Sequence, residues 1–242
     1  MRIRFLIAIL ISALAPCVHG ASNDPTADKV FTIGQQPGDL LGSQGEPFQL
    51  GMDFIANTKT GTGPANGHFE LKWESKDRWW RQIDLGGFRL TEIRVGGKLY
   101  TQRNAGFTPI AVREFLSLLE FTDLDQHRNQ IAIKEQKRCK KDGVKAYCIK
   151  GEIAPGSNER HEIVVSATGS QVLSDDWSAS SDQRRKEEFT NWVALDKYRY
   201  YPRKLQLSVN GEKIVTATVT KLSTTSFDET LLIPPQGALA TR

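Results

Sequence analysis

The sequence has none of the short motifs that mark the commonest enzyme classes. It contains no G-x-S-x-G nucleophile elbow, no Walker phosphate loop and no dinucleotide-binding glycine fingerprint. Its three cysteines lack the C-x-x-C spacing that is typical of zinc sites. We therefore expect a protein that is not an enzyme and that holds neither a metal nor an organic cofactor.

A strong charge of either sign is also missing. The formal net charge of the 242 residues is +4 at pH 7, and it falls to +2 without residues 1–20, which carry two arginines and no acidic residue. No basic cluster is interleaved with aromatic residues in the manner of an RNA-binding surface. The composition therefore argues against nucleic acid as a partner, whereas a hydrophobic content of 39% is enough for a packed core.

One continuous hydrophobic run is present, and it lies at the N-terminus. Phe5–Ala15 is an apolar run of eleven residues, interrupted by Ser12 alone, that follows two arginines. It is too short to cross a bilayer as a helix, which needs about 20 residues. The small-residue rule for signal peptidase is met at Gly20, so we expect a signal peptide at residues 1–20 that is cleaved after Gly20. The mature chain is then expected in the periplasm or outside the cell.

A second interpretation of the same segment stays open. Leu14–Cys17 (LAPC) resembles a lipoprotein box, in which the cysteine is lipidated and begins the mature chain. Such a box has Gly, Ala or Ser before the cysteine, and Pro16 departs from that pattern. We favour conventional cleavage, with a lipid anchor at Cys17 as the alternative.

Two cysteines remain in the expected mature chain, as is usual in an oxidising compartment. Cys139 and Cys148 flank Asp142-Gly143, a pair that favours a tight hairpin turn. We predict a cross-strand disulfide between them, which would contribute roughly 2–3 kcal/mol by restricting the unfolded chain. A reduced or metal-binding pair is the alternative, and the spacing and the lack of a nearby histidine count against it.

Short apolar runs separated by turn residues predict an antiparallel sheet. Phe48–Ala56 alternates apolar with polar or small residues, which indicates a half-buried strand. Phe69–Arg103 contains four runs of strand length, broken by one Ser-Lys-Asp and two Gly-Gly segments. We interpret it as a four-stranded meander, because Gly-Gly supplies the positive φ angles of tight turns.

The hydrophobic period changes to that of a helix in one segment only. Thr108 can cap a helix, and Pro109 suits its first position. Apolar residues then recur at helical spacing over Ile110–Phe121 and cover more than half of its circumference. We predict one main helix here, mostly covered by the concave side of a curved sheet.

Strand signals resume after the helix. Asn210-Gly211 is the strongest hairpin signal of the chain. The polar segment Ser178–Glu187 is expected to be a surface loop, and Pro234-Pro235 is expected to keep the tail out of the sheet. The fold is therefore predicted to be mostly β, with about eleven strands. We expect a flexible leader at residues 21–45 and a single domain at residues 46–242.

Few polar side chains share the apolar face of the meander. Trp79, Ile83 and Arg81 point to one face of their strand, whereas Trp80 points to the other. An arginine on an apolar face requires a buried partner or a ligand anion. Arg81 is therefore the strongest polar candidate for a binding role.

Other candidates for chemistry are interpreted as structural. His68, His127 and His161 are expected to be satisfied or surface side chains. Asp175-Asp176 could form a carboxylate pair or a calcium site, but neighbouring residues on a strand face opposite ways. We therefore expect this pair at the solvated end of a hairpin.

The order of these features resembles the LolA/LolB-like lipoprotein-carrier fold of the bacterial envelope. The similar segments are KWESKDRWWRQI, the hairpin VGGKLYTQ followed by the helix, the hairpin YYPRKLQLSVNG and the closing segment LLIPPQGA. The resemblance covers residues 48–239 and extends to the related domain that precedes a TonB-type module in some envelope proteins. It implies a strongly curved antiparallel sheet that forms a half-barrel around a hydrophobic cavity.

The resemblance also implies a function, which is the binding of a lipid, an acyl chain or a lipoprotein anchor. LolA-type carriers have an Arg-Pro pair before the aromatic strand, and the corresponding segment Trp73–Lys76 lacks that arginine. The alternative is an envelope interaction or scaffold domain with a filled cavity, which contacts partner proteins through an edge strand or exposed aromatics such as Trp80, within a TonB-like or other envelope system. The residues expected to line the cavity are Met52, Phe54, Leu71, Trp73, Trp79, Arg81, Ile83, Leu99, Phe115 and Leu119.

Overall fold

The computed structural model describes residues 40, 45–57, 63–120, 131–153, 160–167, 171–180, 183–197 and 199–241. The expected signal peptide, the alternative anchor at Cys17 and His127 lie outside these residues. So does the expected leader, apart from Gly45 and Leu40, and the side chain of Leu40 is fully buried in the core.

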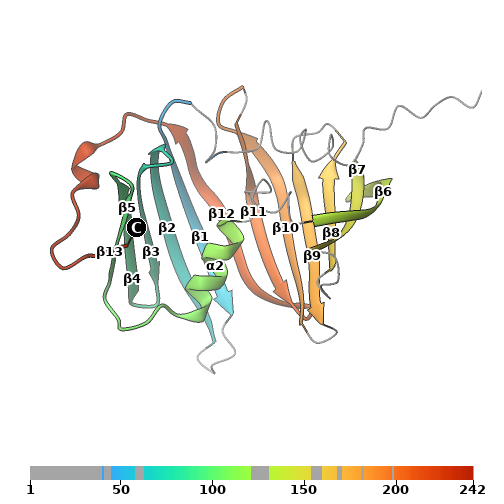
Figure 1. Ribbon diagram of the computed structural model, residues 1–242, viewed down its shortest axis with the longest axis horizontal. Helices are drawn as coiled ribbons and strands as arrows, with labels where there is room; N and C mark the ends of the chain where they lie inside the picture. Colours follow the sequence, from blue (N-terminus) through green and yellow to red (C-terminus); the bar gives the residue numbers. More distant parts are fainter. Residues whose placement is uncertain are drawn as a thin grey trace, which may run out of the picture.

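Thirteen strands, one α-helix and one 3-10 helix make up the described part of the chain (Figure 1). The helices are α2 (Ile110–Glu120) and η1 (Glu229–Leu232). The strands are β1 (Phe48–Asn57), β2 (Pro64–Ser75), β3 (Arg78–Leu85), β4 (Phe88–Val95), β5 (Lys98–Arg103), β6 (Ile131–Lys141), β7 (Val144–Ile153), β8 (Arg160–Ser166), β9 (Val172–Ser180), β10 (Gln183–Ala194), β11 (Tyr200–Val209), β12 (Glu212–Thr224) and β13 (Leu239–Thr241).

All of these strands belong to one antiparallel sheet, in the order β13-β5-β4-β3-β2-β1-β12-β11-β10-β9-β8-β7-β6. Two meanders, β1–β5 and β6–β12, are joined by the pairing of β1 with β12, and β13 is added beside β5. The sheet curves around α2, which packs on β1, β11 and β12 (Figure 1). The predicted fold, a curved antiparallel sheet covered by one main helix, is confirmed, with thirteen strands in the described residues where about eleven were expected.

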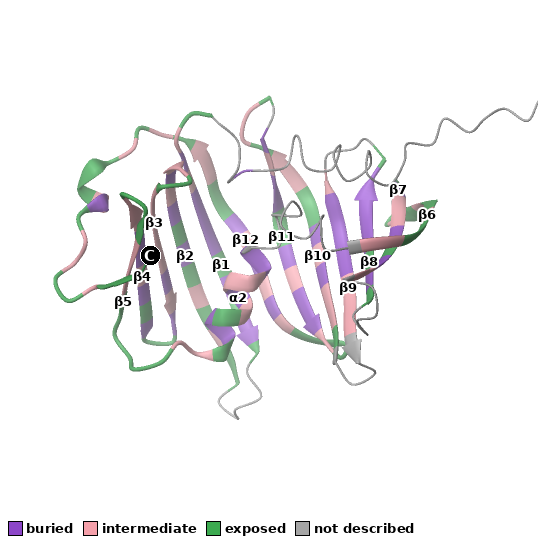
Figure 2. Cartoon of the chain, viewed as in Figure 1, coloured by how far each residue is buried: buried purple, intermediate pink, exposed green. Residues whose placement is uncertain are grey.

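The core lies between the concave face of the sheet and α2. Phe48, Met52 and Phe54 of β1 are buried. Asp53, between the last two, and Ile55, which follows Phe54, are exposed. The antiparallel register carries the same alternation onto β2 and β12, so the inward-facing apolar residues of these three strands are buried together, and Figure 2 shows buried residues alternating with less buried ones along them.

The helix α2 begins and packs as its sequence indicates. The carbonyl of Pro109 accepts hydrogen bonds from the backbone N–H groups of Val112 and Arg113. The side chains of Val112 and Phe115 are fully buried against the sheet. Ile110, which the apolar pattern includes, is 61% exposed because it lies in the first turn, beyond the edge of the buried stripe.

The hairpin turns contain the residues that the sequence predicts. Asp142 and Gly143 have φ values of 49° and 81°, and Asn210 and Gly211 have φ values of 53° and 82°. Two consecutive residues in the left-handed region are the requirement of a type I′ turn, which matches the twist of antiparallel strands. These turns set the register of β6 with β7 and of β11 with β12.

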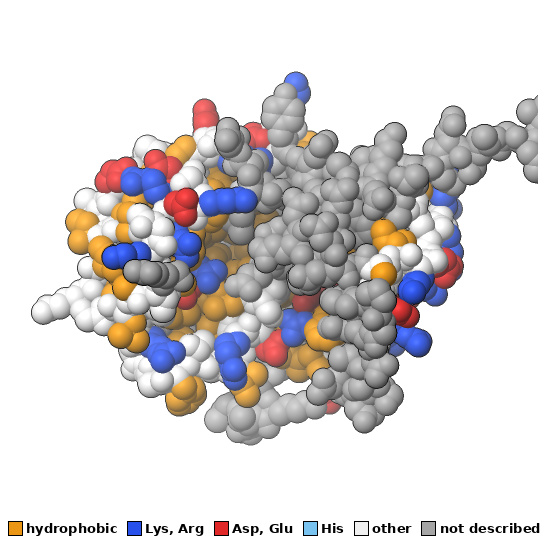
Figure 3. Space-filling view, viewed as in Figure 1, with side chains coloured by type: hydrophobic (Ala, Val, Ile, Leu, Met, Phe, Trp, Pro, Cys, Tyr) orange, Lys and Arg blue, Asp and Glu red, His pale blue; other side chains and the backbone are white. Residues whose placement is uncertain are grey.

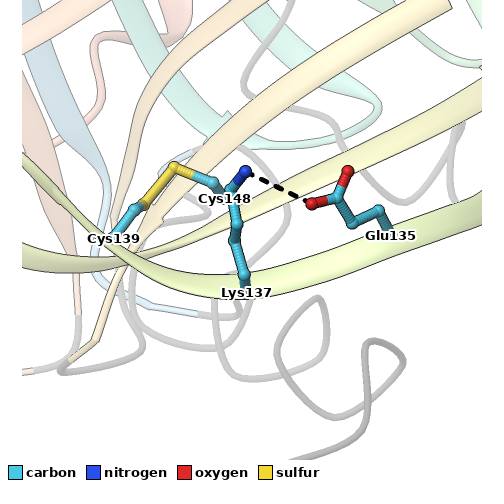
Figure 4. Close-up of a disulfide and its surroundings, with 4 residues drawn as sticks. All are labelled: Glu135, Lys137, Cys139 and Cys148. Atoms are coloured by element: carbon cyan, nitrogen blue, oxygen red, sulfur yellow. Dashed lines mark ion pairs between the residues drawn. A yellow bond between two sulfur atoms is a disulfide. The ribbon is translucent and has the colours of Figure 1, made fainter.

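The predicted disulfide is present. Cys139 of β6 and Cys148 of β7 are bonded, with their Cα atoms 5.8 Å apart, close to the ion pair between Lys137 and Glu135 at 3.2 Å (Figure 4). Since β6 is the last strand of the described sheet, the disulfide ties an edge strand to its one neighbour.

The segment predicted to be a surface loop, Ser178–Glu187, is largely strand. β9 extends to Ser180, and β10 begins at Gln183. Arg185 and Glu187 lie on the concave face, opposite apolar residues of β11. The prediction was wrong because these inward-facing residues are stabilised by ion pairs, which an apolar alternation pattern does not detect.

The tail extends the sheet, contrary to prediction. Pro234 and Pro235 lie in the connection, and the chain resumes extended backbone after Gly237 to form β13. Before that, η1 crosses the outer face of β3 and β4, where Leu232 and Ile93 are buried. Pro234 and Pro235 therefore follow the end of η1 and do not prevent the formation of β13.

Candidate ligand-binding face

The ten residues predicted to line a cavity come together on the concave side of the molecule. Those that are buried in the main core are Met52, Phe54, Leu71, Trp73, Ile83, Phe115 and Leu119. The other three, Trp79, Arg81 and Leu99, are partly exposed on β3 and β5. The predicted set therefore contains a packed part beneath α2 and a more open part towards β5.

Aromatic rings fill the space beneath α2. The ring of Phe115 stacks on Phe54 with centroids 4.1 Å apart and meets Phe69 edge-on at 5.5 Å. Gly67 stands opposite Phe54 in the register, and a Cβ atom at Gly67 would lie 2.1 Å from the ring. The glycine is needed there because any side chain would occupy the volume of that ring.

A second aromatic row crosses the same face at the start of β1. Phe48, Trp73 and Trp79 lie in register on adjacent strands, with ring centroids 6.2 and 6.5 Å apart. The guanidinium of Arg199 lies over Phe48 at 5.6 Å, and that of Arg81 lies over Trp79 at 5.1 Å. The row therefore has a cationic group at each end and a partly exposed indole at Trp79.

Figure 3 shows hydrophobic side chains gathered in a hollow of the concave side beside α2, with charged side chains of both signs at its margin. Partly buried apolar residues that pack against the core on this side include Trp79, Leu116 and Leu222. This hollow, bounded by α2 and strands β1–β5, is called the concave groove below.

Arg81 finds a buried partner within the protein. Its Nε donates to the carboxylate of Glu92 at 2.6 Å, directly across from it on β4. Glu92 is itself buried. Of the two possibilities that the sequence left for Arg81, the internal ion pair is thus present, and it neutralises both charges on an apolar face.

A buried polar cluster, which the sequence did not indicate, lies on the other half of the concave face. Arg185 of β10 donates from Nε to Glu187 at 2.9 Å and from Nη2 to the hydroxyl of Ser117 at 2.6 Å, and its Nη1 pairs with Glu114. Since Ser117 and Glu114 belong to α2, one guanidinium links the helix to the sheet.

Two further members of this cluster come from β8 and β9. The Nδ1 atom of His161 hydrogen-bonds the carboxylate of Asp175 at 2.9 Å, and its ring stacks on Trp177 at 5.9 Å. The register places Asp175 opposite Glu187. Within the described residues, Nε2 of His161 and Oε2 of Glu187 are buried without a hydrogen-bond partner.

Burial raises the pKa of Glu187 to about 7. Arg185 opposes this shift, while the nearby carboxylates Asp175 and Glu114 add to it. Glu187 is therefore a carboxyl group that titrates close to neutral pH.

Asp175 and Asp176 face opposite sides of the sheet, as neighbouring residues on a strand must. Only Asp176 is in contact with solvent. Asp176 points outwards and forms a two-point ion pair with Arg184 at 2.6 and 2.8 Å. Asp175 is fully buried, so the predicted solvated hairpin end is wrong for this residue. The interpretation of His161 as a satisfied histidine holds for Nδ1, which bonds Asp175, and not for Nε2, which has no partner among the described residues.

No protein-family model and no curated protein sequence matches the chain. Solved structures do. A LolA superfamily protein from Nitrosomonas europaea matches with a TM-score of 0.51 and 9% identity, over 86% of this chain and 98% of that one. A DUF1329 family protein from Desulfovibrio piger matches with a TM-score of 0.56 and 12% identity, over 85% and 94%.

A domain assigned to outer membrane lipoprotein sorting, from Vibrio parahaemolyticus, matches with a TM-score of 0.51 and 8% identity, over 86% of this chain and 94% of that one. The chain has a LolA-like fold. At these identities the likeness concerns the fold alone. The LolA-like architecture predicted from the order of the sequence motifs is thereby confirmed.

Two kinds of feature are absent from the described residues. None of the helices there is both long and apolar enough to cross a membrane. No group of three or more His, Cys, Asp or Glu side chains there is arranged to hold a metal ion.

Proposed function

We propose that this chain is a non-enzymatic protein of the bacterial envelope that binds one apolar chain in the concave groove. The ligand is a lipid, an acyl chain or a lipoprotein anchor, and the protein acts in the periplasm. The LolA-like fold supports this function, because two of its structural neighbours are named for the LolA superfamily and for lipoprotein sorting.

The observation that carries the proposal is the partly exposed apolar lining of the groove. Trp79 of β3 and Leu116 of α2 pack against the core and are only partly buried. Each methylene that a ligand buries there contributes about 0.8 kcal/mol, so half of a ten-carbon chain contributes roughly 4 kcal/mol. Such burial is non-directional, which suits a site for hydrocarbon.

The position of α2 determines where the chain can lie. The rings of Phe54 and Phe115 close the space directly under the helix. A ligand therefore lies beside α2, along the aromatic row of β1–β3, where the indole of Trp79, between Trp73 and Arg81, is partly exposed. Trp79 is the residue whose loss should weaken binding most directly.

The test compares two tryptophans on one strand. Trp79 faces the groove, and its neighbour Trp80 faces the opposite side, beneath the C-terminal segment. We expect 1-decanol to bind the wild-type chain in calorimetric titration, and Trp79→Ala to weaken its binding roughly fivefold to tenfold. Trp80→Ala is the matched control and should leave the affinity unchanged. Equal losses in both variants, or no binding to the wild type, would overturn the proposal.

A second candidate function rests on the packing beneath α2. The rings of Phe54, Phe69 and Phe115 fill that space, as expected of an envelope interaction domain whose cavity is closed. Native mass spectrometry of protein purified from its own host distinguishes the two. A co-purified lipid mass supports the binding protein, whereas a clean apo mass together with a failed decanol titration supports the interaction domain.

A further inference from the structure

Arginine outnumbers acidic residues on the concave face of β3, β4 and β5. The register places three arginines there, Arg81, Arg94 and Arg103, with a single carboxylate, Glu92. Arg81 and Glu92 neutralise each other through the ion pair described above. Arg94 and Arg103 therefore carry the excess positive charge of this face.

The surroundings of these two arginines differ. Arg103 is exposed at the end of β5 and donates to the hydroxyl of Thr108 at 3.3 Å. Arg94 lies directly opposite Trp79 on β3 and opposite Leu99 on β5, with its side chain 31% exposed. Arg94 is thus the cation that borders the open end of the aromatic row.

The guanidinium of Arg94 is only loosely paired. The carboxylate of Asp77 stands 4.0 Å from its Nε atom, which is beyond hydrogen-bonding distance, and the Asp77 side chain is 71% exposed. The side chain of Arg94 makes no hydrogen bond to any described residue. An arginine carries five N–H donors in a planar fork. At Arg94, which the register places opposite Trp79, none of these donors has a hydrogen-bond partner among the described residues.

We propose that Arg94 binds the anionic head group of a single-chain amphiphile whose hydrocarbon chain lies in the concave groove. The inference rests on the proposed function and specifies its ligand class. A carboxylate or a phosphate matches the guanidinium fork with two parallel hydrogen bonds, and the partly dry position beside Trp79 strengthens such a charge-assisted contact. A cationic head group would be repelled by Arg94, and a neutral hydroxyl would gain less binding free energy from it than an anionic head group does.

The same strand provides a matched control. Arg89 lies on β4 with Arg94, but it faces the outer side and is already paired with Asp84 at 2.6 Å. Replacing Arg89 removes the same charge from the same strand without touching the groove. Arg94→Lys is a second variant, which keeps the charge and removes the fork.

The experiment titrates the full mature chain with three ten-carbon probes: decanoate, 1-decanol and decyltrimethylammonium. We expect the wild type to bind decanoate about tenfold more tightly than 1-decanol, and decyltrimethylammonium most weakly. Arg94→Gln should abolish the preference for decanoate, Arg94→Lys should retain part of it, and Arg89→Gln should retain all of it. The preference should also shrink as the salt concentration rises.

Each failure has its own signature. If decanoate and 1-decanol bind the wild type equally, or if Arg94→Gln keeps the preference with an unchanged thermal melt, the inference is wrong while the proposed function stands. If none of the three probes binds, the proposed function is wrong, and this inference falls with it. If decanoate binds as expected, a titration with decyl phosphate shows whether the site prefers a phosphate or a carboxylate head group.

Discussion

At the residue scale, Glu187 is a buried carboxyl group whose pKa is raised well above its usual value. It is buried on the concave face, bonded to Arg185 and close to two further carboxylates. Its pKa in the folded chain is about 7, against 4.5 as its usual value. The folded state therefore holds this proton more tightly than the unfolded state, and the contribution of Glu187 to stability depends on pH.

The sign of this dependence follows from the raised pKa. The stability that protonated Glu187 contributes is fully present below pH 4.5 and is lost as the pH rises through 7. The contribution of Glu187 to the free energy of unfolding falls by about 3 kcal/mol across that pH interval. We expect Glu187→Gln, which cannot ionise, to flatten the stability curve between pH 4.5 and 7 and to be more stable than the wild type at pH 8.

Urea unfolding across this pH range measures the effect. Glu188→Gln is the control, because Glu188 follows on the same strand and faces the other side, where it pairs with Lys141 and Lys186. Parallel pH profiles for the wild type and Glu187→Gln would show that Glu187 does not titrate as the buried cluster predicts.

At the element scale, the strand β6 depends on a covalent bond. It is the edge of the described sheet, it pairs with β7 alone, and Cys139–Cys148 joins the two strands. Loss of this bond should cost about 2–3 kcal/mol by the loop-closure argument. Because β7 is the only strand of the described sheet that pairs with β6, we expect the cost to appear first as local opening of this strand.

Hydrogen exchange of the Cys139→Ser/Cys148→Ser variant tests this expectation. Amides of β6 and β7 should exchange faster, while those of β1 and β12 at the centre of the sheet should keep the protection of the wild type. Uniform acceleration over all strands would instead mean that the hairpin and the centre of the sheet unfold as one cooperative unit.

At the scale of the whole molecule, local signals account for the parts that could be predicted. The Asp142-Gly143 and Asn210-Gly211 turns are recognisable because each turn is specified by two adjacent residues. The cluster around Arg185 was missed because its partners on α2 lie 68 and 71 positions away in sequence. The pairing of β13 with β5 was missed for the same reason, since it depends on where η1 leads the chain.

The proposed site can also be related to the stability of the whole fold. The concave groove is bounded by α2 and by β1, and β1 joins the two meanders through its pairing with β12. A ligand that binds only the folded state stabilises it by about 2.7 kcal/mol when its concentration is one hundred times its Kd. For a domain of this size the melting temperature should then rise by about 5–10 °C. We expect this rise with 1-decanol for the wild type and for Trp80→Ala, and at the same ligand concentration a smaller rise for Trp79→Ala. A rise of equal size in all three proteins would place the ligand outside the groove.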